Sequence, residues 1–191
     1  PSVRAKCRMR RARRSSQIEK INETVLDIFT DIDIDAVKQG DEPLEQLLAS
    51  RLVTAGRELD DKAIDDPLVV ADMKERLGTT LVSLGFAKDA IEFLERAQSI
   101  RERKLGIEHV NTLLISNMLG VAYAKAGELE KALPLLEESL TLLKLKLGPK
   151  HPNTLAAIGN LAAAHHDAGE LDMALPLLEE TLRLRRDVLG D

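Results

Sequence analysis

The chain is poor in aromatic residues and in cysteine, and both shortages narrow its possible folds. Of its 191 residues, three are Phe, one is Tyr and none is Trp. Sheet sandwiches need β-branched and aromatic side chains on their strands, so this composition argues against them. The single cysteine, Cys7, excludes an internal disulfide framework and a cysteine-based zinc site.

Long uncharged runs are missing as well. The longest stretches without a formal charge, 109–124 and 151–166, have sixteen residues each and are too short to span a bilayer as helices. No apolar segment follows the basic N-terminus, so no signal peptide is predicted and we expect a cytoplasmic protein. Because the chain starts at Pro1 without an initiator Met, we expect it to be a piece of a longer polypeptide.

Charge is distributed unevenly along the chain. Residues 1–14 carry seven basic groups and no acidic one, and since the total is −5, residues 15–191 carry −12. An acidic body repels phosphate backbones, so no nucleic acid partner is expected for it. We interpret 1–15 as a basic disordered tail that is suited to contacts with anionic surfaces.

Two copies of one segment make up the C-terminal part of the sequence. Residues 107–148 and 149–190 align without a gap, and 21 of the 42 positions are identical. A weaker third copy covers 65–106, with nine identities that fall mainly at packing and turn positions. Self-similarity at this period predicts an array of helical repeats, each packing on its neighbours.

Each copy predicts a pair of helices. In the last copy, Pro152 suits the first position of one helix, and Gly169 supplies a left-handed stop after it. The apolar spacing of the second helix predicts one buried stripe. The stripe consists of Leu171, Ala174, Leu175, Leu178 and Leu182.

The end of the last copy is predicted to be open. Leu177, Leu184 and Val188 fall off the stripe, so we expect some of them to form an uncovered patch. Weak self-association through this uncapped repeat is therefore predicted, and the parent protein is expected to continue with more repeats.

Small residues recur where the two helices of a pair would touch, at Gly78, Gly120 and Ala162 in the first helix of each copy. Together with Ala-x3-Leu in the second helix, as in Ala132 to Leu136, this pattern resembles the tetratricopeptide repeat. The 42-residue period and the HPNTL motif at 151–155 are similar to the kinesin-light-chain type. The leading aromatic residue of the family pattern is absent, and Lys74, Ser116 and Ile158 stand in its place.

The resemblance covers 65–190 and implies an all-α fold, a right-handed superhelical solenoid of helix-turn-helix repeats. It implies three repeats, at 65–106, 107–148 and 149–190. No repeat signature is found in 16–64, where apolar residues at helical spacing in 16–32 and 43–63 predict a helical hairpin that packs on the first repeat.

The four histidines are predicted to be structural rather than metal-binding. His109 and His151 occupy the same repeat position, and equivalent positions in stacked helix pairs lie about 10 Å apart, too far for one ion. His165 takes the position of Tyr123 and is expected to pack, and His166 points elsewhere on the helix. No cofactor, metal site or catalytic residue is predicted.

The candidate binding site is the concave wall of the array, which first helices form in stacked helical repeats. In kinesin-light-chain-type repeats, an Asn directly before the motif Leu contacts the backbone of an extended peptide, and Asn160 matches that position. Met118 and Arg76 replace it in the other two copies. The residues expected on this wall are Glu75, Arg76, Thr79, Asn117, Met118, Val121, Lys125, Gly159, Asn160, Ala163, His166 and Asp167.

These observations predict a non-catalytic protein–protein interaction module that presents a concave groove to a peptide or protein. Two alternatives stay open. The chain is a regulatory or sensor segment of a larger signalling enzyme, such as a bacterial serine/threonine kinase, if a kinase domain precedes it. It is an electrostatic adaptor if binding depends on salt and on the basic residues 4–14.

Overall fold

The computed structural model describes residues 43–58 and 66–189. Over these residues the chain forms seven helices and no strand, and the predicted all-α fold is confirmed. The chain divides into two compact units, residues 1–73 and 74–191. The predicted basic tail and the predicted helix at 16–32 lie outside the described residues.

Helix α3 (Leu44–Glu58) belongs to the first unit and lies within 43–63, where the second helix of the hairpin is predicted. Its apolar spacing buries Ala49, Leu52 and Ala55 along one side, as expected for an amphipathic helix. The pairing of this helix with 16–32 stays a prediction.

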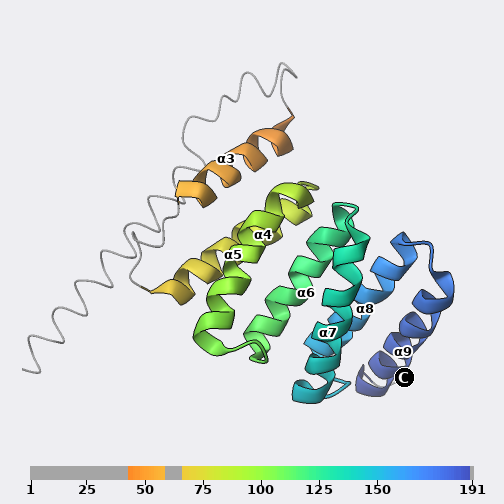
Figure 1. Cartoon of the computed structure of the whole chain (residues 1–191). Coiled ribbons are helices and arrows are strands. Elements are labelled where there is room, and N and C mark those ends of the chain that lie inside the picture. Colours follow the sequence, from red (N-terminus) through yellow and green to blue (C-terminus); the bar gives the residue numbers. More distant parts are fainter. Residues whose placement is uncertain (1–42, 59–65, 190–191) are drawn as a thin grey trace, which may run out of the picture. The chain divides into compact units, whose positions relative to one another are not determined.

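Six further helices follow in three pairs, one pair within each 42-residue copy. The pairs are α4 (Pro67–Ser83) with α5 (Ala87–Leu105), α6 (Val110–Lys125) with α7 (Leu129–Leu147), and α8 (Pro152–Asp167) with α9 (Leu171–Leu189). From α5 to α9, each helix packs on the next, in the row shown in Figure 1. Along the described helices, none combines the length and the apolar character needed to cross a membrane.

The row is tighter on the side of α6 and α8, which are the first helices of the second and third pairs. Helix α6 also contacts α8, whereas α7 lies farther from α5 and from α9 than α6 does from α8. A stack whose helices lie closer together on one side curves toward that side. The surface that α6 and α8 expose on that side is therefore the concave face of the second unit, called the inner face below. The second helices, α5, α7 and α9, lie on the outer side.

Histidine caps start two of the first helices. His109 and His151 have extended backbones, and their Nδ1 atoms accept hydrogen bonds from the backbone N–H of Asn111, at 3.2 Å, and of Asn153, at 3.1 Å. Each bond satisfies a donor that the helix cannot pair internally. Pro152 follows at the first helical position, as predicted.

Glycine ends the first helix of each of these pairs. Gly127 and Gly169 have φ angles of 84° and 77°, in the left-handed region that favours glycine. The N–H of the next residue then turns back, from Glu128 to the Tyr123 carbonyl and from Glu170 to the His165 carbonyl, at 2.8 Å in both cases. These bonds close the hairpin between the two helices.

Two glycines let the helices of a pair touch. A Cβ placed on Gly120 would lie 2.7 Å from Cγ of Leu136, and a Cβ placed on Gly78 would lie 2.7 Å from Cγ of Leu94. Both leucines are fully buried. In the third pair, Ala162 stands at the glycine position. Its methyl group takes up space, so Leu178, the counterpart of Leu136, cannot approach α8 as closely.

The predicted orientation of the stripe on α9 is wrong. Of its five residues, only Ala174 is buried, and the other four are 48–56% exposed. Conversely, Leu184, which is predicted to lie in the uncovered patch, is only 7% exposed, and Leu177 is half-buried. The side chain of Val188 lies outside the described residues.

The cause of this error is visible in α7, where the same stripe contains Leu136 and Leu140, 0% and 5% exposed. Helix α7 is packed against α6 on one side and α8 on the other, so its stripe is covered from both directions. Among the described residues, α9 contacts α8 but has no helix on its other side. Periodicity locates a stripe, but it does not tell which neighbour covers it.

Candidate binding surface

The predicted groove residues lie on α4, α6 and α8, and most of them are accessible. The exposed ones are Arg76, Lys125, Ala163, His166 and Asp167. The half-buried ones are Glu75, Thr79, Met118, Val121, Gly159 and Asn160. Asn117 differs from the prediction, because it is only 6% exposed and lies behind the inner face.

Asn117 supports Asn160 through a chain of hydrogen bonds. Nδ2 of Asn160 donates to Oδ1 of Asn117 at 2.6 Å, and Nδ2 of Asn117 donates to Oγ of Ser139 at 3.3 Å. Ser139 in turn donates to the Leu136 carbonyl at 3.0 Å. This series of hydrogen bonds links α8, α6 and α7. It fixes the orientation of the Asn160 amide, since buried polar groups need their partners.

Asn160 keeps polar groups for a ligand. One of its two N–H groups is used in the contact with Asn117, and its side chain is half-buried on the inner face. Its carbonyl oxygen and its second N–H match the donor and acceptor of a peptide backbone. The structure therefore gives this residue a fixed orientation that sequence reasoning did not predict.

A second polar contact holds α4, α5 and α6 together. Arg101 is only 6% exposed. Its guanidinium group donates to Oε2 of Glu75 at 2.6 Å and to the Asn111 carbonyl at 3.1 Å. Charged side chains are rarely buried unless they are paired in this way. Glu75, which is predicted to face a ligand, thus also serves this internal contact.

A contact between successive repeats recurs at one motif position. The Tyr123 hydroxyl on α6 donates to Oε1 of Glu95 on α5. One repeat later, Nε2 of His165 lies 3.9 Å from Oε1 of Glu137, and its Nδ1 lies 2.7 Å from Oε2 of Glu170. Burial, and then the hydrogen bond to Glu95, raise the pKa of Tyr123 to about 12.

The four histidines have separate roles in this arrangement. His109 and His151 cap helices, and His165 packs between repeats at 4% exposure. His166 is exposed, and its Nδ1 lies 3.3 Å from Oδ1 of Asp167. Among the described residues, no three His, Cys, Asp or Glu side chains are grouped so that they could hold a metal ion.

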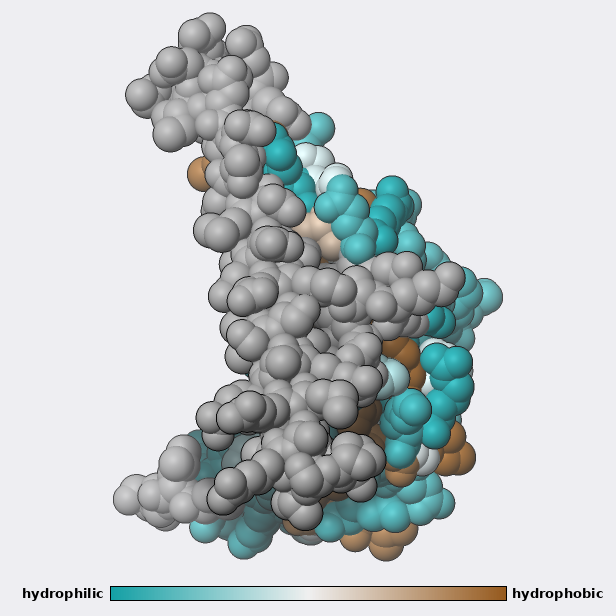
Figure 2. Space-filling view, turned by 90° about the vertical axis from the view of Figure 1, so that its left-hand side faces the viewer, coloured by the Kyte–Doolittle hydropathy of each residue, from teal (hydrophilic) through white to brown (hydrophobic). Residues whose placement is uncertain are grey.

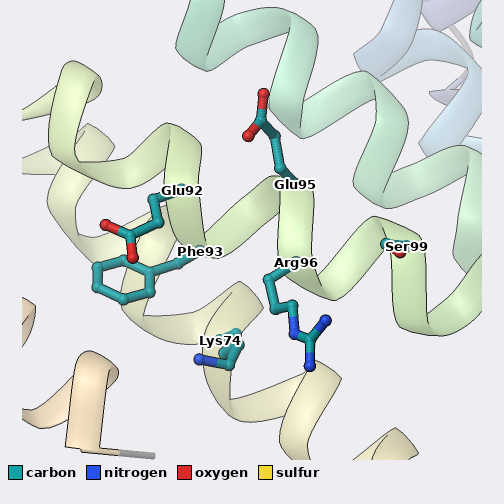
Figure 3. Close-up of a pocket in the computed structure, with 6 residues that line it drawn as sticks. All are labelled: Lys74, Glu92, Phe93, Glu95, Arg96 and Ser99. Atoms are coloured by element: carbon teal, nitrogen blue, oxygen red, sulfur yellow. The ribbon is translucent and has the colours of Figure 1, made fainter.

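Two of the hollows on the outer side bear on the repeat pattern, and neither was predicted from the sequence. One, of about 130 Å³, lies between α5 and α7 above α6, with Gln98, Ser116 and Leu142 in its wall. The other, of about 400 Å³, lies beside α5 and is lined by Lys74, Glu92, Phe93, Glu95, Arg96 and Ser99, as Figure 3 shows. Glu95 points away from Lys74 in this view.

The position of the missing family aromatic lies in the wall of both hollows. Lys74 and Ser116 occupy its position in the first two copies, and each lines one of the hollows. Lys74 instead places its ammonium group 5.6 Å from the centre of the Phe93 ring. The absence of a large ring at this position was the signal in the sequence that could have predicted them.

Exposed hydrophobic side chains are concentrated on one helix. On the face shown in Figure 2, the described residues are mainly hydrophilic, and hydrophobic ones emerge in separate clusters. Of the eight large hydrophobic residues that are exposed in the described part of the chain, five lie on α9. These five are Leu171, Met173, Leu175, Leu178 and Leu182.

Comparison with known proteins agrees with this geometry. The sequence profile of the tetratricopeptide repeat matches residues 69–145 and 115–187. A Podosopora anserina protein of the kinesin light chain type, with nearly identical TPR-like repeats, superposes with a TM-score of 0.61 at 20% identity, over 95% of this chain and 93% of that chain.

A second solved structure is BtubC (BKLC) from P. vanneervenii, with a TM-score of 0.58 at 18% identity over 90% of this chain and 74% of that chain. At such identities the two structures show a shared fold, and the predicted helical-repeat solenoid is confirmed. Among curated protein sequences, none matches this chain.

Proposed function

Because the chain belongs to the tetratricopeptide repeat family, whose repeats generally bind proteins, we propose that it is a non-catalytic interaction module whose inner face takes a peptide or protein partner. The observation that carries this proposal is the fixed Asn160 amide. It lies among accessible residues of the inner face, and a buried hydrogen-bond chain holds it from behind.

The inner face is suited to an extended peptide. Ala163 is small and exposed, so a peptide backbone can approach α8 closely beside Asn160. Met118 and Val121 on α6 are half-buried and supply an apolar surface of adaptable shape. Lys125 and Asp167 lie near the C-terminal ends of α6 and α8 and provide charges of both signs for selectivity.

A displayed library of random peptides, selected against the full chain, provides ligands for a direct test. Ala163→Glu and Met118→Glu should each weaken the selected peptides about tenfold or more, because either places an unpaired carboxylate on the inner face. Leu145→Glu is the matched control, since Leu145 is 78% exposed on the outer helix α7. Affinities that respond to Leu145→Glu and not to the other two would refute the proposal.

Asn160→Ala tests the role of the amide itself. Loss of a backbone-reading hydrogen bond should weaken the peptides by about 1–3 kcal/mol. Because Asn117 also loses its partner, the unfolding midpoint must be measured beside the affinity. An affinity equal to that of the unmodified chain would place the ligand elsewhere.

A further inference from the structure

Two places on the outer side of the second unit are equivalent by the repeat. The first lies between α5 and α7 above α6, and the second lies between α7 and α9 above α8. Because they are one 42-residue period apart, each residue of the first has a counterpart in the second. The second place therefore shows which groups the chain uses to join two neighbouring outer helices.

An ion pair joins the outer helices at the second place. Nζ of Lys144 on α7 lies 2.9 Å from Oε1 of Glu180 on α9. One period earlier, the counterparts are Glu102 on α5 and Glu138 on α7, and both line the hollow of about 130 Å³. Neither of these two carboxylates forms an ion pair with another described residue, and no basic residue lines the hollow. Two negative charges thus stand at the first place without a cation.

The apolar filling of the second place is missing from the first as well. Leu140 and Ile158 are 5% and 0% exposed, and their counterparts are Gln98 and Ser116. Nε2 of Gln98 donates to Oγ of Ser116 at 2.9 Å, and Ser116 donates to the Thr112 carbonyl at 2.9 Å. The Ser116 hydroxyl is therefore satisfied within the chain, so an apolar group can enter the hollow without leaving it unpaired.

The hollow has the size of an aromatic side chain. Its volume of about 130 Å³ is close to that of a cavity of about 150 Å³ that holds a benzene ring. Ile107, which is 66% exposed, and Leu142 supply apolar contacts in its wall. A second hollow, of about 370 Å³, shares Gln98, Leu135 and Glu138 with the first. The surface therefore continues beyond the space for one ring and has room for a peptide.

We propose that the hollow between α5 and α7 binds a basic peptide segment of a partner protein, in which a Phe is flanked by Lys or Arg. The ring enters the hollow, and a neighbouring cation lies between Glu102 and Glu138. The segment supplies the apolar group and the positive charge that the chain itself supplies one repeat later. Opposite charge selects the segment, and the buried ring gives it affinity. This site lies on the outer side and does not depend on the proposed inner-face site.

The probe is a fluorescein-labelled peptide of sequence Gly-Arg-Phe-Arg-Gly, titrated with the full chain in an anisotropy experiment. An ionic strength of about 0.15 M largely screens distant charges. We expect saturable binding with one peptide per chain. A peptide with Ala in place of Phe should bind about tenfold more weakly, because it buries no ring. A peptide with Glu in place of both Arg should not bind.

Glu102→Lys tests the charge of the site. It gives Glu138 the partner that Glu180 has in Lys144, so the affinity for the probe should fall about tenfold or more, without a loss of stability. Glu130→Lys is the matched control, because it makes the same change of charge at an exposed position of α7 outside the hollow. The control should keep the affinity within about twofold of the unmodified chain.

Gln98→Leu combined with Ser116→Ile tests the apolar part. The double variant introduces the two residues that the chain has at Leu140 and Ile158, so the filled hollow should exclude the ring and the affinity should fall about tenfold or more. Its unfolding midpoint is measured beside the affinity. If the double variant does not fold, Glu102→Lys and the peptide with Ala decide the question.

The proposal is overturned if the probe does not bind, or if it binds Glu102→Lys as tightly as the unmodified chain. Equal binding of the peptide with Ala would also overturn it, because charge alone would then account for the contact. Peptides selected on the inner face should not displace the probe, and displacement would overturn the assignment to the outer side. Failure of this site thus remains distinguishable from failure of the inner-face site.

Discussion

The second and third repeats share half of their residues and form the same helices, but they differ in what they bury. Leu136 is fully buried in the second repeat, and its counterpart Leu178 is 48% exposed in the third. Local sequence determines where each helix begins and ends, and it does so equally in both copies. Burial depends on the neighbouring repeat, as expected of an array whose units pack only on one another.

One sequence difference between the two repeats contributes to the different burial of Leu136 and Leu178. Gly120 leaves room for Leu136, whereas Ala162 fills the equivalent space with its own methyl group and is 1% exposed. This substitution acts on Leu178 only. The exposure of Leu171, Leu175 and Leu182 follows from the open side of α9.

The largest expected effect is on the two leucines themselves. Leu136→Ala should lower the free energy of unfolding by about 2–5 kcal/mol, because it leaves a cavity between α6 and α7. Leu178→Ala should cost less than about 1 kcal/mol, because the side chain is half in solvent. Denaturant unfolding of both variants measures the contrast, and equal losses would mean that Leu178 is covered in solution.

Substitutions of Gly120 and Ala162, the small residues where the two helices of a pair touch, test the difference between the second and third repeats. Gly120→Ala should destabilise the chain by about 1–3 kcal/mol, since the new Cβ meets Leu136 at the heart of the pair. Ala162→Gly should cost about 0.5–1 kcal/mol, the usual penalty for glycine within a helix. If Gly120→Ala proved neutral or stabilising, the helices would be able to separate without loss, and the close contact would not specify the pair.

The interface between the first and second repeats can be followed through its tyrosine. The unfolded hydroxyl titrates near pH 10, and the folded pKa of Tyr123 is raised to about 12. The raised pKa stabilises the folded state fully below the unfolded pKa, and this contribution is lost as the pH rises through the folded pKa. In Tyr123→Phe, the free energy of unfolding should therefore fall less as the pH rises from the unfolded pKa to the folded pKa.

Tyr123 is the single tyrosine of a chain without tryptophan, so tyrosinate absorbance reports on it alone. Glu95→Gln should bring its pKa down toward the ordinary value while burial keeps part of the shift. An unchanged titration in Glu95→Gln would show that the hydrogen bond between repeats does not form.

The sequence predicted the elements that depend on local chemistry. Pro152 and Gly169 mark the ends of α8, and the repeated small residues mark where the helices of a pair touch. These features could be read because caps, turns and close contacts require particular residue types within a few positions.

Features that depend on neighbouring repeats could not be read in the same way. The spacing of Asn117 places it on the inner side of α6, but its amide is buried because Asn160 and Ser139 lie within hydrogen-bond reach. The predicted orientation of the α9 stripe is wrong because periodicity does not identify the helix that covers it. Both are properties of contacts between repeats, which one helix does not encode alone.

We propose that the inner face of α6 and α8 binds a peptide or protein partner. A map of backbone amide chemical shifts, recorded on the isotope-labelled full chain with a selected peptide, tests it most directly. We predict that the largest changes centre on Met118, Val121, Asn160 and Ala163. Changes confined to the outer helices α5 and α7 would contradict the claim.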